Sequence, residues 1–158
     1  MQMQKKINSW LITQIDKGTQ TDYLELDSGE FLSNEIIIEV KNSALNYKDA
    51  LAITGMAPII RKFPLIPGID FSGVVIQSKN KKFGEGDRVF ATGLGLGELQ
   101  HGGLSSHAST DADILIKLPN KYTHSYIMGL GTAGLTAMLA VLALHENSIK
   151  PDAGKVLV

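Results

Sequence analysis

Hydrophobic and polar residues alternate in short runs from Trp10 to about Lys117, and glycine-containing turns separate these runs. The clearest run is Glu35–Val40, in which β-branched side chains dominate, as is typical of a strand. Further strands are predicted at Tyr23–Leu26, Ile69–Gln77, Arg88–Thr92, Leu104–Thr110 and Ile114–Lys117. Several short strands at this spacing favour a β-barrel or a β-sandwich. The predicted fold class is therefore mainly β with some α.

The last quarter of the chain follows a different pattern. Thr132–Glu146 is rich in Ala, Leu and Met and is apolar on nearly every face, which predicts a helix buried between layers of structure. After a turn at Pro151–Gly154, Lys155–Val158 opens an apolar run of the kind found in strands buried on both faces of a parallel sheet. We therefore expect one domain over residues 1–127, and the first helix and strand of a second, truncated domain over residues 128–158.

The chain has 158 residues, a formal net charge of −1 and no cysteine. The near-neutral charge argues against a nucleic acid or an anionic membrane as a partner. The lack of cysteine excludes a disulfide framework, a thiolate nucleophile and Cys-ligated zinc. The apolar stretch Leu135–Leu144 is about half as long as the roughly 20 residues that cross a bilayer, and no export signal is visible. We expect a cytoplasmic protein with no membrane partner.

Two glycine clusters resemble cofactor-binding turns. Gly129–Gly134 has the spacing G-x-G-x-x-G, but a phosphate-binding turn also needs a strand directly before it and an acidic residue at the end of the next strand. The preceding Pro119–Ser125 is predicted to be a loop, and Asp152 comes before a strand. We interpret these glycines as positions that let the helix pack closely. Gly93–Gly97 has no helix after it and is predicted to be a flexible loop near a site.

A compact polar block, Asn46–Asp49, lies between a predicted strand and a predicted helix. Its amide, phenol and carboxylate could together position a carbonyl group of a ligand. Alternatively, Asn46 and Asp49 could cap the helix, and Tyr47 could lie in the core with its hydroxyl hydrogen-bonded. Composition and spacing leave both interpretations open.

Three blocks of this sequence resemble the medium-chain dehydrogenase/reductase superfamily. They are Ala44–Gly55, Phe63–Gly73 and Gly129–Met138, with Gly102-Gly103-Leu104 in the expected place between them. The blocks are most similar to the zinc-independent quinone oxidoreductase branch, in its acryloyl-CoA reductase-like subgroup. The resemblance implies a GroES-like partial β-barrel, followed by the first helix and strand leading into a Rossmann domain that binds NADPH. By this resemblance, the chain is the N-terminal portion of such a protein.

The resemblance also implies roles for individual residues. Tyr47 would approach the nicotinamide of the cofactor, and Asn46 and Asp49 would shape the same catalytic pocket. Thr132 and Thr136 would make further cofactor contacts near the nicotinamide. Zinc-dependent relatives carry a histidine where this chain has Ile69, so a metal-free site is expected.

The reaction implied by the resemblance is hydride transfer to the β-carbon of a conjugated carbonyl, followed by protonation at the α-carbon. The substrate would be a quinone, an enone or an acyl-CoA, and a full-length protein could be a homodimer. Whether Tyr47 donates the proton or hydrogen-bonds to the cofactor is left open, and residues 1–158 alone are expected to be inactive. The alternative function is a non-enzymatic GroES-like β-barrel that serves as a binding module.

Overall fold

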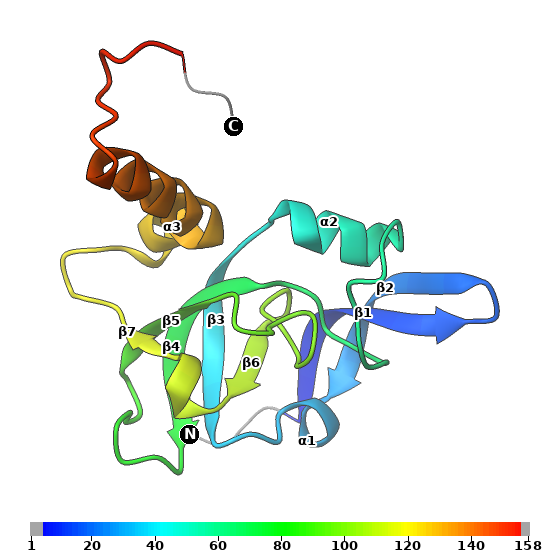
Figure 1. The fold of residues 1–158 in the computed structure, drawn as a ribbon. Coiled ribbons are helices and arrows are strands. Elements are labelled where there is room, and N and C mark those ends of the chain that lie inside the picture. Colours follow the sequence, from blue (N-terminus) through cyan, green and yellow to red (C-terminus); the bar gives the residue numbers. More distant parts are fainter. Residues whose placement is uncertain (1–4, 156–158) are drawn as a thin grey trace.

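A computed structural model describes residues 5–155 of the chain (Figure 1). Its helices are α1 (Ser28–Phe31), α2 (Tyr47–Thr54) and α3 (His124–Glu146), with a short 3-10 helix at Ala112–Ile114. Its strands are β1 (Lys6–Ile15), β2 (Gly18–Asp27), β3 (Ile36–Ala44), β4 (Asp70–Ser78), β5 (Arg88–Thr92), β6 (His107–Thr110) and β7 (Ile116–Lys117). The predicted fold class, mainly β with some α, is confirmed.

The strands form an antiparallel hairpin, β1–β2, and a five-stranded antiparallel sheet in the order β6-β3-β4-β5-β7. Two isolated bridges, Ser9 to Ser105 and Ile12 to Leu65, connect β1 with the loops beside this sheet. One hydrophobic core, around Phe71, is built mainly from buried side chains of the five-stranded sheet. A second core joins β1, α1 and Ile37. The hairpin and the sheet therefore curve toward each other as a partial barrel.

The sequence pattern located most of these strands. Arg88–Thr92 is confirmed with the same bounds. The strands predicted at Glu35–Val40 and Ile69–Gln77 each begin one residue before β3 and β4 and are otherwise confirmed. The pattern missed β1, because Asn8 and Ser9 interrupt its apolar residues. Ser9 is nevertheless completely buried, and its hydroxyl donates to the carbonyl of Trp10 at 2.9 Å. Ser9 is thus a buried, hydrogen-bonded polar residue at a position where the hydrophobic pattern predicts a solvent-facing side chain.

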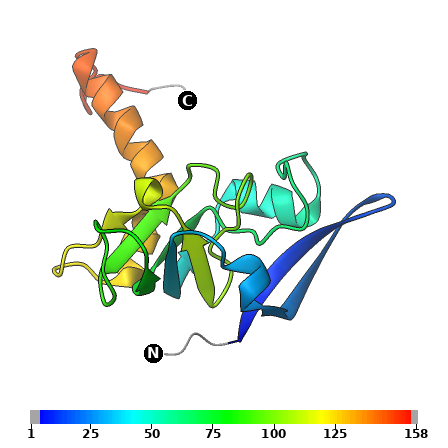
Figure 2. The same cartoon turned by 90° about the horizontal axis from the view of Figure 1, so that it is seen from below.

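Helix α3 corrects two expectations about the last quarter of the chain. It begins at His124, inside the segment predicted to be a loop, because the hydroxyl of Thr123 accepts a hydrogen bond from the backbone N–H of Tyr126 and caps the helix. It is also not buried. Figures 1 and 2 show α3 extending away from the sheets, and side chains such as Leu135, Leu139 and Val141 are more than half exposed.

By length and composition α3 could cross a membrane, since its mean hydropathy reaches 2.0 over its most apolar window. Helices that are buried against another domain in larger soluble proteins pass the same criterion, so the prediction of no membrane partner stays a prediction. The boundary predicted between residues 127 and 128 also stays a prediction. Of the predicted strand Lys155–Val158, all but Lys155 lies outside the described residues.

Candidate active site

The carboxylate of Asp70, the first residue of β4, joins three elements of the fold. Its side chain is completely buried. Oδ2 accepts hydrogen bonds from Nδ2 of Asn46 at 2.9 Å and from the backbone N–H of Thr132 at 2.8 Å, while Oδ1 accepts from the hydroxyl of Thr132 at 2.6 Å. Because Asn46 precedes α2 and Thr132 lies in α3, this one carboxylate holds both helices against the sheet.

Gly131 makes this contact possible. It interrupts α3 with φ of 47° and ψ of −154°, a backbone conformation that is almost confined to glycine. A Cβ atom at Gly131 would lie 2.5 Å from Oδ2 of Asp70. The interruption frees the N–H of Thr132 from the helix, and Asp70 accepts it as a helix-capping side chain would.

The G-x-G-x-x-G block therefore lies inside a helix. The interpretation that its glycines let the helix pack closely is confirmed for Gly131. Within residues 5–155, a Cβ at Gly129 would meet nothing within 4 Å, and the nearest neighbour of a Cβ at Gly134 is Leu130 of the same helix, so for these two glycines the interpretation stays a prediction. In the described part of the chain, Gly131 is the glycine of this block that a close approach to another element requires.

Asn46 and Asp49 fix the start of α2. Asn46 is the N-cap residue, and its backbone N–H donates to Oδ2 of Asp49 at 2.8 Å. Oδ1 of Asp49 accepts from the backbone N–H of Ile69 at 3.0 Å. Burial raises the pKa of the Asp49 carboxyl above its ordinary value of 3.8, although these hydrogen bonds oppose the shift. The capping interpretation is thus confirmed for both residues, and the catalytic role of Asp49 stays a prediction.

Tyr47 is 80% exposed, so the interpretation that placed it in the core is wrong. The next residue, Lys48, forms an ion pair of 2.9 Å with Glu98, which connects α2 to the loop that contains the second glycine cluster. In that loop, a Cβ at Gly93 would lie 3.9 Å from the hydroxyl of Thr132. The loop therefore runs beside Thr132. The structure brings Asn46, Asp70 and Thr132 into contact, and Tyr47 directly follows Asn46 in the sequence.

The two threonines of α3 both donate their hydroxyl hydrogens within the protein. Thr132 donates to Asp70, and Thr136 donates to the backbone carbonyl of Thr132 at 2.8 Å. Each hydroxyl oxygen keeps lone pairs for an additional donor. Thr136 is exposed and Thr132 partly exposed, so both present hydrogen-bond acceptors one helical turn apart.

Asp70 was missed as a functional residue by sequence reasoning. Nothing in its neighbourhood in the sequence reveals a partner 62 residues away in α3. The available signal was a charged residue inside the strongly apolar start of β4, since a buried carboxylate requires hydrogen-bond partners.

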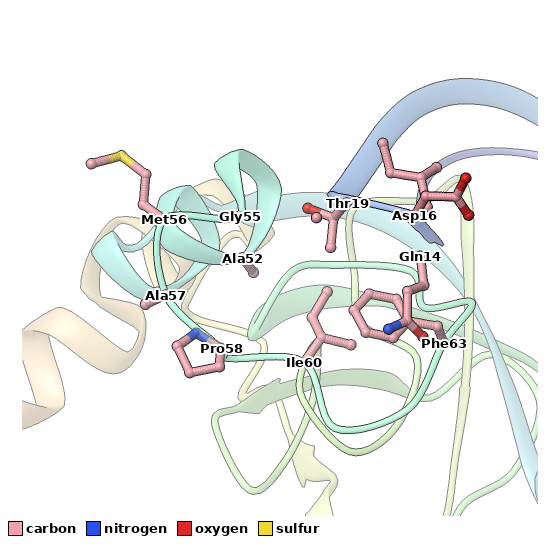
Figure 3. A pocket seen from close by; sticks show the side chains of 12 residues that line it. Gln14, Asp16, Thr19, Ala52, Gly55, Met56, Ala57, Pro58, Ile60 and Phe63 are labelled. Atoms are coloured by element: carbon pink, nitrogen blue, oxygen red, sulfur yellow. The ribbon is translucent and has the colours of Figure 1, made fainter.

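A cavity of about 390 Å³ lies at the opposite end of α2, between the tip of the β1–β2 hairpin and residues 56–63 (Figure 3). Figure 3 shows Thr19 beside Gly55, and Oγ1 of Thr19 is buried with no hydrogen-bond partner in the described part of the chain. Asp16 is the single ionisable residue among those described in the lining, and none of the predicted site residues contributes. We therefore place the candidate site at the N-terminal end of α2.

The prediction of a metal-free site stays a prediction. Within residues 5–155, no three His, Asp or Glu side chains lie close enough together to hold one metal ion. Ile69 is buried, and its backbone N–H donates to Oδ1 of Asp49.

His124 holds the start of α3 against the sheet. The hydroxyl of Ser72 donates to the carbonyl of Val89 at 2.9 Å, so Nδ1 of His124, 2.7 Å from that hydroxyl, is the donor in their contact. Burial, and then the positive charges of Arg88 and Lys41, hold the pKa of His124 below its ordinary value of 6.5. The folded protein thus favours neutral His124.

Because the unfolded chain takes up this proton more readily, the stability contributed by His124 is complete above its ordinary pKa of 6.5 and is lost as the pH falls through that value toward the lower folded pKa. We expect the free energy of unfolding to fall between about pH 7 and about pH 5, and His124→Asn to show a smaller decrease. Urea denaturation at both pH values measures this. An equal decrease in both proteins would contradict the assignment.

Residues 32–120 match the family described as the alcohol dehydrogenase GroES-like domain. The chain belongs to this family. The matched residues include Asn46, Tyr47 and Asp70, while Thr132 and Thr136 follow the matched segment. The GroES-like domain therefore supplies the α2 side of the candidate site, and α3 supplies the other side.

Two curated relatives of this GroES-like chain are oxidoreductases by name. AcuI of Escherichia coli (strain K12), named as a probable acrylyl-CoA reductase, is 43% identical over 148 residues, which are 94% of this chain and 46% of AcuI. YhfP of Bacillus subtilis (strain 168), which carries the name of a quinone oxidoreductase, is 45% identical over 123 residues, covering 78% of this chain and 37% of YhfP. The chain thus spans less than half the length of these relatives.

The crystal structure of E. coli K-12 YhdH with bound NADPH has the same fold. It superposes with a TM-score of 0.87 at 42% identity, covering 92% of this chain and 45% of YhdH. Together with AcuI and YhfP, it confirms the resemblance to quinone oxidoreductase and acryloyl-CoA reductase proteins that the three sequence blocks predicted.

Proposed function

We propose that this chain forms the catalytic side of a zinc-independent, NADPH-dependent reductase of conjugated carbonyl compounds. The observation that carries the proposal is the Asp70 cluster, which fixes Asn46 and Thr132 to one carboxylate beside the exposed phenol of Tyr47. The names of AcuI and YhfP and the NADPH bound to YhdH support the same function. The substrate would be an acyl-CoA such as acryloyl-CoA, an enone or a quinone.

The residues of the site fit the nicotinamide end of NADPH. A carboxamide group donates two N–H hydrogens, and the hydroxyl oxygens of Thr132 and Thr136 offer acceptors because their own hydrogens are already donated within the protein. Tyr47 adds an exposed aromatic ring with a hydroxyl group. These three residues would hold the nicotinamide, and NADPH would supply the hydride that adds to the β-carbon of the substrate.

The protein's own residues would orient the reactants and handle the proton. Tyr47 would bind the carbonyl oxygen or deliver a proton to the α-carbon, because its hydroxyl is exposed at the start of α2. Asn46 and Asp49 would act as positioning residues, since the side chain of Asn46 is bound to Asp70 and both carboxylate oxygens of Asp49 accept backbone N–H groups. Asp70 would keep α2 and α3 in register across the site.

The remaining assignments follow from this function. Residues 1–127 would form the GroES-like catalytic domain, and residues 128–158 the helix and strand that lead into a cofactor-binding domain. The exposed apolar side chains of α3 fit such an arrangement, because a helix of this composition is stable in water when another domain covers it. A homodimer and a cytoplasmic location complete the proposal.

Tyr47→Phe should lower the turnover number about tenfold without changing the melting temperature. The expected effect is modest because a water molecule can partly replace the phenol hydroxyl as a hydrogen-bond donor. The test uses the protein expressed from the complete coding sequence that contains this chain, with NADPH oxidation followed in the presence of acryloyl-CoA and of a quinone.

Tyr23→Phe is the matched control, because Tyr23 is also exposed but packs against Trp10 in the β1–β2 hairpin. It should leave both turnover and melting temperature unchanged. Equal turnover in the wild type and Tyr47→Phe would remove Tyr47 from the chemistry. No NADPH oxidation with any of these substrates would favour the alternative function, a non-enzymatic binding module.

A further inference from the structure

We propose that a second cavity, lined in part by residues 99–101, binds a small oxyanion such as phosphate. The cavity has a volume of about 200 Å³ and lies between the segment after α1, the segment before β4 and residues 99–101. None of the residues that line it is used by the proposed reductase. The proposal therefore stands independently of that function.

The lining of this oxyanion cavity contains hydrogen-bond donors and no carboxylate. The polar residues among those described in its wall are Ser33, Asn34, Lys62, Gln100, His101 and Ser109. A cavity that would take a cation or a neutral alcohol normally offers acceptors, and carboxylates above all. The composition of this wall instead suits a ligand that carries several acceptor oxygens and a negative charge.

His101 supplies one of the hydrogen-bond donors in the lining. The backbone N–H of Ile66 donates to Nδ1 of His101 at 3.2 Å, so the neutral imidazole carries its hydrogen on Nε2. The ring packs against Phe31 with ring centroids 5.1 Å apart, which fixes its orientation. Within residues 5–155, no group accepts a hydrogen bond from Nε2, so this N–H is available to a ligand.

Lys62 supplies the charge. It is exposed and forms no ion pair with the carboxylates of the described chain. Burial first, and then the positive charge of Lys62, lower the pKa of His101 below its ordinary value of 6.5. No carboxylate contributes to this shift. Because Lys62 and His101 line the same cavity, an anion bound there would lie beside both the ammonium group and the imidazole.

The floor of the cavity adds a third donor. The backbone N–H of Asn34 donates to Oγ of Ser109 at 2.7 Å, and Ser109 is 5% exposed. Because its oxygen already accepts this bond, the hydroxyl hydrogen of Ser109 can be donated to a ligand. Lys62, His101 and Ser109 thus offer an ammonium, an imidazole N–H and a hydroxyl to the same small volume, which matches the several oxygens of a phosphate group.

The phosphate could be free in solution or could belong to a larger molecule that carries a phosphate monoester. The test uses the protein expressed from the complete coding sequence and isothermal titration in two arms, one with inorganic phosphate and one with coenzyme A. We expect phosphate to bind, and Lys62→Gln to weaken that binding about tenfold, which corresponds to the loss of one charge-assisted hydrogen bond. Arg61→Gln, which removes a neighbouring charge outside the lining, should bind like the wild type.

The second arm separates the two sources. Binding of coenzyme A that is tighter than that of phosphate, and that weakens by the same factor in Lys62→Gln, would identify a phosphate monoester as the ligand. Phosphate binding that exceeds coenzyme A binding would identify the free anion. The imidazole resonances of His101 should shift on addition of the bound ligand, which places it in this cavity without any measurement of turnover.

The proposal would be overturned if phosphate and coenzyme A both failed to bind, or if Lys62→Gln and Arg61→Gln weakened binding equally. A second variant, His101→Asn, keeps an acceptor for the N–H of Ile66 and removes the imidazole Nε2 donor. It should also bind phosphate less tightly, while circular dichroism confirms that it is folded. Unchanged binding in this folded variant would contradict the site as well.

Discussion

Replacing Asp70 by alanine should lower the free energy of unfolding by about 3 kcal/mol and release α3 from the sheet. The substitution leaves the side-chain amide of Asn46 and both donors of Thr132 without their shared acceptor. Each buried donor without a partner costs about 1–3 kcal/mol, and water reaches Asn46 and Thr132 in part, which keeps the sum near the lower end. Removal of a buried charge offsets some of this loss.

Urea denaturation of Asp70→Ala and of a matched variant, Asp111→Ala, measures the effect. Asp111 is exposed, and its side chain makes no capping hydrogen bond to the 3-10 helix that follows. We expect Asp111→Ala to lie within about 0.5 kcal/mol of the wild type. Asp70→Asn should be intermediate, because an amide keeps one acceptor oxygen. If Asp70→Ala and Asp111→Ala were equally stable, Asp70 would not be what connects α2 to α3.

Gly131→Ala should lower the free energy of unfolding by about 2–4 kcal/mol. Alanine is strained at φ of 47° and ψ of −154°, and its Cβ would lie 2.5 Å from Oδ2 of Asp70, which is backed by a buried strand and cannot withdraw. The carboxylate would have to give up the N–H of Thr132, so the variant should also lose NADPH oxidation if Thr132 holds the nicotinamide.

Gly129→Ala, in the same helix, should change the free energy of unfolding in the opposite direction. A Cβ at Gly129 meets nothing within 4 Å, and its backbone is helical. Alanine is preferred to glycine in helices by about 0.5–1 kcal/mol, so this variant should be slightly more stable than the wild type. The contrast is measured by thermal or urea denaturation of the two variants. Equal stability of Gly131→Ala and Gly129→Ala would show that the break at Gly131 is not required by the fold.

Gly129 and Gly131 show which structural features can be predicted from the sequence pattern and which cannot. The pattern identified strands such as Arg88–Thr92 because alternation and turns are local properties of the chain. It recognised that Gly129–Gly134 is not a phosphate-binding turn, since the context around the glycines is also local. It could not tell which glycine is required, because that depends on Asp70, which lies 62 residues from Thr132 in the sequence.

The candidate site likewise has features that the sequence predicts and features that depend on the three-dimensional structure. The polar block before α2 was visible as a group, and its capping role was one of two interpretations that the residues left open. The exposure of Tyr47 and the occupied hydroxyls of Thr132 and Thr136 depend on how α2 and α3 meet. The burial predicted for α3 failed for a related reason, because an apolar helix indicates that a covering surface is needed without indicating which residues provide it.

The enzyme that we propose this chain to be part of transfers hydride to the β-carbon of a conjugated carbonyl. The most direct measurement uses the protein expressed from the complete coding sequence, NADPH that carries deuterium at its transferable position, and acryloyl-CoA, with the product analysed by NMR. We expect propionyl-CoA with one deuterium at the β-carbon. Deuterium at the carbonyl carbon, or no deuterated product from acryloyl-CoA or from a matched enone, would contradict the proposed reaction.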